Sequence, residues 1–280
     1  MGCDSVAETK SVFSEIIRQK IKEYRLMDDA FFSEVFRGDT EAASFLLCVI
    51  LDRSDLNVIQ VDTQAEYKNA ARRSVRLDIR AVDAAGQIYD IEIQKSDDGA
   101  LPQRTRYYSG MIDSELLDKN DPFSALGQTY VIFITENDYF SAGCPIYHIE
   151  RCIKELNDAY FGDGSHILYV NGAFRDATHP IGRLMHDFHC MTAEDMFYPV
   201  FAERVHYFKE TERGYQTMSR VTEELMEIGR MEAFYELYTD QRISKNEFAA
   251  YVGISVDEVD SFIKEKISIY PRSPKKTTNE

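Results

Sequence analysis

The chain has 280 residues, of which 44% are apolar, and it carries a formal net charge of −16 at pH 7. This composition is typical of a globular protein rather than a disordered one, and the length admits either one domain with a large appendage or two small domains. The negative charge opposes nonspecific binding to phosphate polymers, although the charge is unevenly distributed along the chain.

Neither a membrane span nor a secretory signal is evident in the sequence. No run approaches the about 18 consecutive apolar residues that a span needs, and the N-terminal segment lacks the apolar core of a signal peptide. We therefore expect a cytoplasmic protein without a membrane partner. Its five cysteines are widely spaced, odd in number and form no C-x-x-C pair, which predicts reduced thiols rather than a disulfide scaffold or a zinc ribbon.

The first predicted elements are two helices within residues 26–52. Asp28 and Asp29 are alternative caps for the first helix, and the second begins at Asp39 or Thr40, after a glycine that ends the first. Phe32, Val35 and Phe36 share one face of the first helix. This pattern predicts that the first helix packs on a core.

A predicted strand over residues 56–63 leads into a basic stretch. That stretch has a local net charge of +4, from Lys68, Arg72, Arg73, Arg76 and Arg80 against the one acid Asp78. Two interpretations remain open: a patch that binds phosphates, or a solvated loop, since runs of charge usually lie at the surface.

Residues 76–95, RLDIRAVDAAGQIYDIEIQK, predict a β-hairpin in which polar and apolar residues alternate. A three-residue loop with Gly86 in the left-handed conformation would pair Asp83 with Gln87. Counting back along both strands then places Asp78 opposite Glu92. The same register puts Arg76 of the first strand opposite Gln94 of the second.

Two acids opposite each other in a hairpin suggest a metal site. Directly opposed residues have Cβ atoms about 4.5–5.5 Å apart, and like charges at that distance destabilise a sheet unless a cation lies between them. Paired carboxylates bind a hard divalent ion such as Mg²⁺, which supports phosphodiester hydrolysis. In the alternative interpretation, Asp78 and Glu92 pair with Arg76, Arg80 or Lys95 on a solvated face.

The elements after the hairpin complete a predicted α/β or α+β core over residues 20–180. A helix is predicted at residues 101–117, a central strand covered on both faces at 128–136, and two further strands at 145–151 and 165–172. From residue 181 to residue 268 the pattern is helical and strongly charged, and residues 269–280 form a polar tail that we expect to be disordered.

Two features of the C-terminal part have other interpretations. His186, His189 and Cys190 could reach one metal ion from a helix, but a fourth ligand at characteristic spacing is lacking, so we do not expect a zinc site. Residues 243–265 predict two short helices around Gly253, like a helix-turn-helix. The second of them, from Ser255, carries three acids and no arginine, which favours a protein-facing pair or a vestigial domain over a DNA reader.

The hairpin motif of Asp78 followed by Glu92 and Gln94 resembles the PD-(D/E)XK nuclease superfamily. More closely, the chain is similar to the Rpn-like recombination-promoting nucleases, also described as PD-(D/E)XK nuclease family transposases. The resemblance spans roughly residues 24–215 and rests on five stretches in order: LMDDAFFSEVF, RLDIRAVDAAGQIYDIEIQ, RTRYYSGMID, TYVIFITENDYF and DGSHILYVNG. It implies an α/β restriction-endonuclease-like core, a central mixed sheet flanked by helices, followed by a helical C-terminal region.

The same resemblance implies the residues of a metal site. Asp78 and Glu92 would be metal ligands together with the backbone carbonyl of Ile93, and Mg²⁺ or Mn²⁺ would be the cofactor. Gln94 stands where the superfamily usually has lysine. Glutamine can orient water but supplies no charge, so slow or conditional cleavage is the expected consequence. Asp28 or Asp29 would supply a further acid from the first helix.

The helix at residues 101–117 provides the candidate substrate contacts. The resemblance places Arg104 and Tyr108 beside the metal, where they could hold a phosphate, and Arg76 of the basic stretch is the third candidate. In the alternative interpretation, Tyr108 and Met111 are ordinary core residues and Arg104 is an ion-pair partner of Asp78 or Glu92.

The sequence thus predicts a metal-dependent DNA endonuclease, with a role in recombination or mobile elements. The rival hypothesis is a catalytically weak or inactive module that keeps the nuclease fold and binds nucleic acid or a protein. A third hypothesis, a zinc-stabilised structural protein, rests on the cluster around His186 alone. Target preference, DNA against RNA, and assembly of the chain into a homo-oligomer are left open by the sequence.

Overall fold

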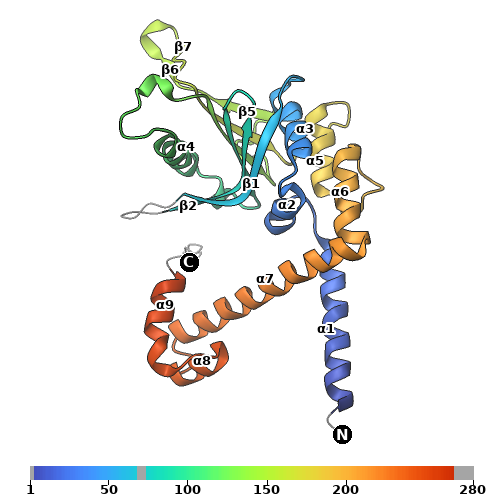
Figure 1. Ribbon diagram of the computed structural model, residues 1–280. Helices are drawn as coiled ribbons and strands as arrows, with labels where there is room; N and C mark the ends of the chain where they lie inside the picture. Colours follow the sequence, from blue (N-terminus) through green and yellow to red (C-terminus); the bar gives the residue numbers. More distant parts are fainter. Residues whose placement is uncertain (1–2, 68–73, 268–280) are drawn as a thin grey trace. The chain divides into compact units, whose positions relative to one another are not determined.

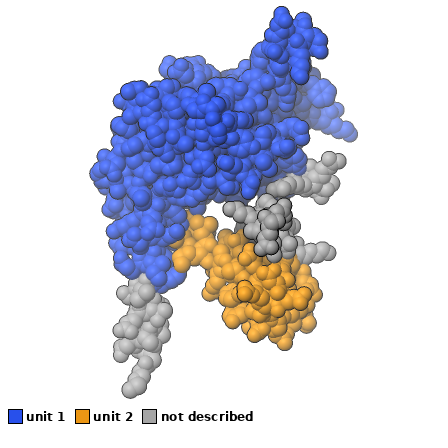
Figure 2. All heavy atoms as spheres, turned by 180° about the vertical axis from the view of Figure 1, so that it is seen from behind, with its two compact units in different colours: residues 1–219 blue, residues 220–280 orange. Residues whose placement is uncertain are grey.

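A computed structural model describes the backbone of residues 3–67 and 74–267. The chain divides into two compact units, residues 1–219 and residues 220–280 (Figure 2). The predicted core of residues 20–180 therefore lies within the first unit, and the predicted helical region from residue 181 is shared between the two. The predicted tail of residues 269–280 and the basic residues Lys68, Arg72 and Arg73 lie outside the described residues.

The first unit is built on a six-stranded mixed sheet (Figure 1). Its strands are β1 (Val58–Tyr67), β2 (Val75–Asp83), β3 (Ile88–Gln94), β4 (Thr129–Thr135), β5 (Ile146–Ile149) and β8 (Ser165–Asn171), in the order β1-β2-β3-β4-β8-β5. The central neighbours β3, β4 and β8 run parallel, whereas β1, β2 and β5 pair antiparallel. The predicted α/β fold with a central mixed sheet flanked by helices is confirmed.

Helices cover both faces of this sheet (Figure 1). On one face lie α2 (Asp29–Phe36) and α3 (Thr40–Leu51), with α5 (Pro180–His189) and α6 (Pro199–Glu210) packed beside them. On the other face α4 (Pro102–Leu116) packs against β4. A parallel strand covered on both sides needs apolar residues throughout, which explains the unbroken apolar run of β4.

Aromatic side chains fill the core on both faces of the sheet. On the α2 face, Phe32 packs against Phe36 and Phe188, with ring centroids 4.7 and 5.9 Å apart. On the α4 face, Tyr108 contacts Phe133 edge to face at 6.1 Å. Tyr108 and Met111 both belong to the buried cluster of that face, so their interpretation as core residues is confirmed.

The helix boundaries follow local capping chemistry. The Asp39 side chain accepts a hydrogen bond of 3.0 Å from the Ala42 N–H and so caps α3, as predicted. Asp28 occupies the cap position of α2, but its side chain makes no capping bond there. The carboxylate of Asp28 is therefore free of that structural role.

Several elements were not expected from the sequence. These are α1 (Cys3–Glu23), a small two-stranded sheet of β6 (Cys152–Ile153) and β7 (Ala159–Tyr160), and the short 3-10 turn η1 (Asp97–Gly99). None of the described helices is long and apolar enough to cross a membrane.

The helical part ends in α7 (Glu212–Thr239), α8 (Lys245–Val252) and α9 (Val259–Ile267). The predicted pair of short helices around Gly253 is confirmed: Gly253 ends α8 with φ of +78°, and Ser255 opens the turn that leads into α9. Glycine adopts this left-handed backbone without a steric penalty, which explains the sharp end of α8.

Candidate active site

The β2–β3 hairpin has the predicted register. The ladder pairs Ile79 with Ile91 through Val82 with Ile88, and the Asp83 N–H donates 3.1 Å to the Gln87 carbonyl. Gly86 has φ of +78°, as the predicted bulged turn requires. The same register, continued by one pair, places Asp78 opposite Glu92.

At Asp78 and Ile93 the backbone N–H groups bond to side-chain carboxylates instead of to backbone carbonyls of the opposite strand. The Asp78 N–H donates 2.9 Å to Glu92 Oε1, and the Ile93 N–H donates 3.1 Å to Asp78 Oδ2. Each carboxylate is therefore held by the backbone of the opposite strand, in the gap between β2 and β3. The Ile93 carbonyl lies on the same edge of β3 as its N–H, because both groups of a strand residue face the same neighbouring strand.

Both acids are buried, with exposed fractions of 8% for Asp78 and 0% for Glu92. Burial raises the pKa of Asp78 well above its ordinary value, and the charges of Glu92 and Asp29 raise it further. Burial and the neighbouring Asp90 likewise raise the pKa of Glu92. A cation in the gap would relieve this repulsion.

Neither acid pairs with the cations named in the alternative interpretation. Arg80 bonds to the Tyr67 hydroxyl and to Asp62, and Lys95 pairs with Asp28. The interpretation as a solvated face with mixed charges is therefore wrong.

Arg104 is the cation that does reach this site. Its Nη2 donates 2.9 Å to Glu92 Oε2, and its Nη1 donates 2.9 Å to Gln94 Oε1. The guanidinium also lies over the Tyr108 ring, 4.9 Å from the centroid, and Nη2 donates 2.8 Å to the hydroxyl of that tyrosine. The predicted alternative, in which Arg104 is an ion-pair partner of Glu92, is confirmed.

Gln94 is fixed between Arg104 and Glu92. Its amide oxygen accepts from Arg104, and its amide nitrogen lies 3.4 Å from Glu92 Oε2. Gly99 of η1 permits this placement, because a Cβ atom at residue 99 would lie 2.2 Å from Gln94 Oε1. The sequence analysis missed Gly99. Its position between a predicted strand and a predicted helix was the signal that could have found it.

Asp90 is a second residue that the sequence analysis missed. It lies on the same face of β3 as Glu92 and is fully buried. Neither carboxylate oxygen of Asp90 has a hydrogen-bond partner in the described part of the chain, and burial together with the charge of Asp78 raises its pKa. Asp90 in turn raises the pKa of Glu92.

The two acids at the start of α2 differ in their surroundings. Asp28 accepts 2.6 Å from the Arg25 N–H and pairs with Lys95. Asp29 accepts 3.3 Å from Gln64, the β1 residue whose φ of 57° interrupts the β1–β2 ladder beside Asp78. The charge of Asp29 raises the pKa of both Asp78 and Glu92, and the choice between Asp28 and Asp29 as the acid from the first helix stays a prediction.

Arg76 lies apart from this group. It is exposed and stands opposite Glu66 in the β1–β2 ladder rather than in the gap between β2 and β3. A contact of Arg76 with substrate stays a prediction.

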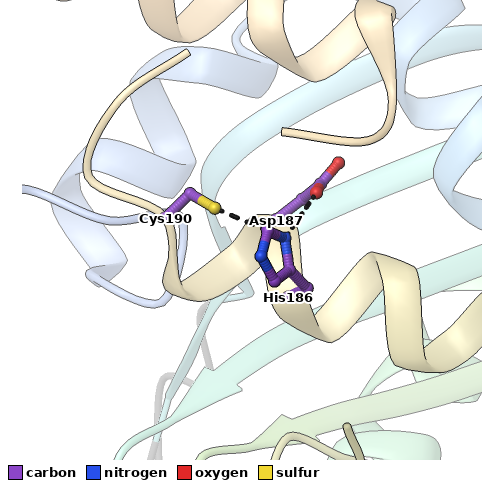
Figure 3. A group of neighbouring side chains, drawn as sticks. All are labelled: His186, Asp187 and Cys190. Atoms are coloured by element: carbon purple, nitrogen blue, oxygen red, sulfur yellow. Dashed lines mark hydrogen bonds and ion pairs between the residues drawn. The ribbon is translucent and has the colours of Figure 1, made fainter. Parts of the chain in front are cut away.

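A separate cluster lies at the end of α5 (Figure 3). His186 Nδ1 is 3.3 Å from Asp187 Oδ1 and 3.5 Å from Cys190 Sγ. His189, which the sequence analysis grouped with them, instead contacts the Gly172 carbonyl and Arg25. The structure therefore groups Asp187, and not His189, with His186 and Cys190.

Comparison with known families supports the fold. The family model described as PD-(D/E)XK nuclease family transposase matches residues 31–172, which is half of the chain and includes Asp78, Glu92, Gln94 and Arg104. No curated protein and no solved structure gives a significant match.

Proposed function

Because the chain belongs to the PD-(D/E)XK nuclease family transposases, we propose that it is a metal-dependent endonuclease that hydrolyses phosphodiester bonds of DNA. The observation that carries this proposal is the pair of buried carboxylates, Asp78 and Glu92, held in one gap at the end of the β2–β3 ladder. Two like charges in that position destabilise the folded protein unless a cation binds between them.

The donor set fits a hard divalent cation. Asp78 and Glu92 offer carboxylate oxygens, and the Ile93 carbonyl lies on the same edge, as Mg²⁺ or Mn²⁺ prefers. Asp29 would add negative charge from α2. When bound, such an ion supplies an acidified water and neutralises charge on the phosphate.

The remaining residues orient the reactants. Gln94, fixed by Arg104 and Glu92, would direct a water toward the phosphate through its amide without titrating. Arg104 presents a fork of donors that suits phosphate oxygens, provided that it exchanges its bond to Glu92 for one to the substrate. Tyr108 holds the guanidinium at the site through its hydroxyl.

The test is plasmid cleavage by the purified full-length protein with Mg²⁺ or Mn²⁺. We expect the parent to nick DNA, and Asp78→Asn to abolish nicking while the protein remains folded. Asp62→Asn is the matched control, since Asp62 is an acid of the same sheet outside the gap. Equal nicking by the parent and Asp78→Asn would identify a contaminant and overturn the proposal.

A second candidate function is a weak or inactive nuclease-fold module. The observation that favours it is the engagement of Glu92 and Gln94 by Arg104, which neutralises the site internally. Such a module would bind DNA or a protein without cleaving. Metal-dependent stabilisation that is lost in Glu92→Gln, without any nicking, would favour this second function.

The biological context is a further part of the proposal. Recombination and the movement of mobile elements both need DNA ends, and a nuclease of this family would produce them. Strand transfer requires attack by a DNA end instead of water, so an assay that detects joined products would distinguish transfer from hydrolysis.

A further inference from the structure

The cluster of His186, Asp187 and Cys190 contains three different metal-binding groups. Among the residues that the structure describes, their imidazole nitrogen, carboxylate oxygen and thiol sulfur form a set of donor atoms that all lie within 4.8 Å of one another. They lie on α5 and at its end, not on the strands that carry Asp78 and Glu92. The nuclease proposal uses none of them.

The spacing of these donors suits a tetrahedral ion. With bonds of about 2.3 Å to sulfur and about 2.0 Å to nitrogen and oxygen, a tetrahedral Zn²⁺ site separates sulfur from nitrogen by about 3.6 Å and nitrogen from oxygen by about 3.3 Å. The corresponding distances from His186 Nδ1 are 3.5 Å to Cys190 Sγ and 3.3 Å to Asp187 Oδ1. The side chains would need little movement to bind an ion.

One proton cannot serve both contacts of His186 Nδ1. His186 Nδ1 can either donate to Asp187 or accept from Cys190, but it cannot do both, and both contacts are long for hydrogen bonds. A metal ion would bond to all three atoms at once. The side chain of His186 is 42% exposed, so an ion can enter from solvent.

The surroundings hold the carboxylate in place. Asp187 is fully buried, and its two oxygens each accept 2.8 Å from the backbone N–H groups of Phe197 and Tyr198. Hydrogen bonds of this kind orient the carboxylate ligands of metal sites. The His186 ring also packs on Phe197, with centroids 4.6 Å apart.

The electrostatic environment favours a cation. The C-terminal end of a helix carries partial negative charge, to which the buried Asp187 adds. A bound divalent ion would replace the proton of the Cys190 thiol.

We propose that His186, Asp187 and Cys190 form a zinc site with a fourth position open to water. The ion would fasten the end of α5 to the loop that leads into α6, because Asp187 and His186 both contact residue 197 of that loop. The missing fourth ligand does not oppose the site, since three protein ligands and a water are a common zinc coordination.

The test is titration of the reduced, chelator-treated full-length protein with Co²⁺ and then Zn²⁺. A thiolate–Co²⁺ bond gives a charge-transfer absorption that oxygen ligands do not give, so the Asp78–Glu92 site cannot produce it. We expect this absorption to saturate at one equivalent and to disappear when Zn²⁺ replaces Co²⁺. Cys190→Ser should lose the absorption, and His186→Gln should lower Zn²⁺ affinity more than about 10-fold.

Two controls make the outcome decisive. Cys144→Ser removes an exposed free thiol elsewhere and should leave the absorption unchanged, as should Asp78→Asn. Absence of the absorption in the parent, or its persistence in Cys190→Ser, would overturn the zinc site. Circular dichroism of Cys190→Ser would show that the loss is one of ligation and not of folding.

Discussion

At the scale of single residues, Arg104 is the key to the metal-free site. Glu92 is fully buried, and Arg104 is its ion-pair partner at 2.9 Å. Burial and the charge of Asp90 raise the pKa of Glu92, and Arg104 is the cation that opposes this shift. Arg104 is the ion-pair partner of Glu92, and in the proposed function it would also offer donors to a phosphate.

Arg104→Ala tests this compensation. Leaving Glu92 buried and without this partner should lower the metal-free stability by about 1–3 kcal/mol. Mn²⁺ should restore part of the loss, so the rise in melting temperature on adding Mn²⁺ should be larger in Arg104→Ala than in the parent. Arg106→Ala, an exposed arginine on the same helix, is the control. An equal Mn²⁺ response in all three proteins would show that the metal does not bind at Glu92.

Asp78 should make metal-free stability depend on pH. Burial and Glu92 raise its pKa, so the folded protein holds this proton more tightly than the unfolded chain does. The site's contribution to stability is therefore present at low pH and is lost as pH rises from about 4 through the raised folded value. Asp78→Asn has no such proton to lose. Its stability relative to the parent should increase with pH.

The measurement is the difference in melting temperature between Asp78→Asn and the parent, in chelator, at about pH 5 and about pH 8. Asp62→Asn is the matched control, since Asp62 is half-exposed and paired with Arg80 outside the gap. A difference for Asp78→Asn that stays constant across this range would mean that the Asp78 carboxyl is not perturbed by its neighbours.

At the scale of elements, η1 between β3 and α4 sets the position of the Gln94 amide. Gly99→Ala would place a methyl group 2.2 Å from Gln94 Oε1 and so displace the Gln94 amide from Arg104. We expect a stability loss of about 1–3 kcal/mol and a loss of nicking at least as large as that of Gln94→Ala.

Gly110→Ala is the matched control for this prediction. Gly110 lies inside α4, and a Cβ atom there meets nothing within 4 Å. Alanine in a helix interior stabilises by about 0.5–1 kcal/mol relative to glycine, so Gly110→Ala should be neutral or stabilising and should cleave DNA like the parent. Full activity of Gly99→Ala would show that Gln94 need not be held by Arg104.

The elements also show what a sequence can predict. The β2–β3 register follows from two local facts, the alternation of polar residues and the left-handed Gly86, and both are properties of the sequence itself. The engagement of Gln94 by Arg104 depends instead on how η1 bends the chain between β3 and α4. No periodicity encodes that bend, so both Arg104 assignments had to remain open.

Contacts between distant segments also explain why the sequence did not predict Asp187 as a member of the cluster on α5. The two short strands β6 and β7 were missed for a different reason, their length. Asp187 is held by the backbone of residues 197 and 198, which a loop brings back across the helix end, so its spacing to His186 alone did not indicate a ligand. β6 and β7 have two residues each, too few for an alternating pattern to develop.

At the scale of the whole molecule, each of the two units has a core of its own. Residues 220–280 contain a buried cluster of Phe248, Ala249 and Val259, around which aromatic residues of α7 and α9 pack. The sheet, the two acids, Arg104 and the segment matched by the family model all belong to residues 1–219. The proposed metal chemistry should therefore not require the second unit.

A chain shortened to residues 1–219 tests this independence. We expect it to fold, to melt at a temperature that Mn²⁺ raises by the same amount as in the full chain, and to lose the Mn²⁺ response in Glu92→Gln. Nicking that persists in the shortened chain would assign the whole reaction to the first unit. If the Mn²⁺ response is retained but nicking is lost, the second unit contributes to DNA binding. Loss of the Mn²⁺ response in a folded shortened chain would contradict the prediction, because the acids would then need residues 220–280 to hold their geometry.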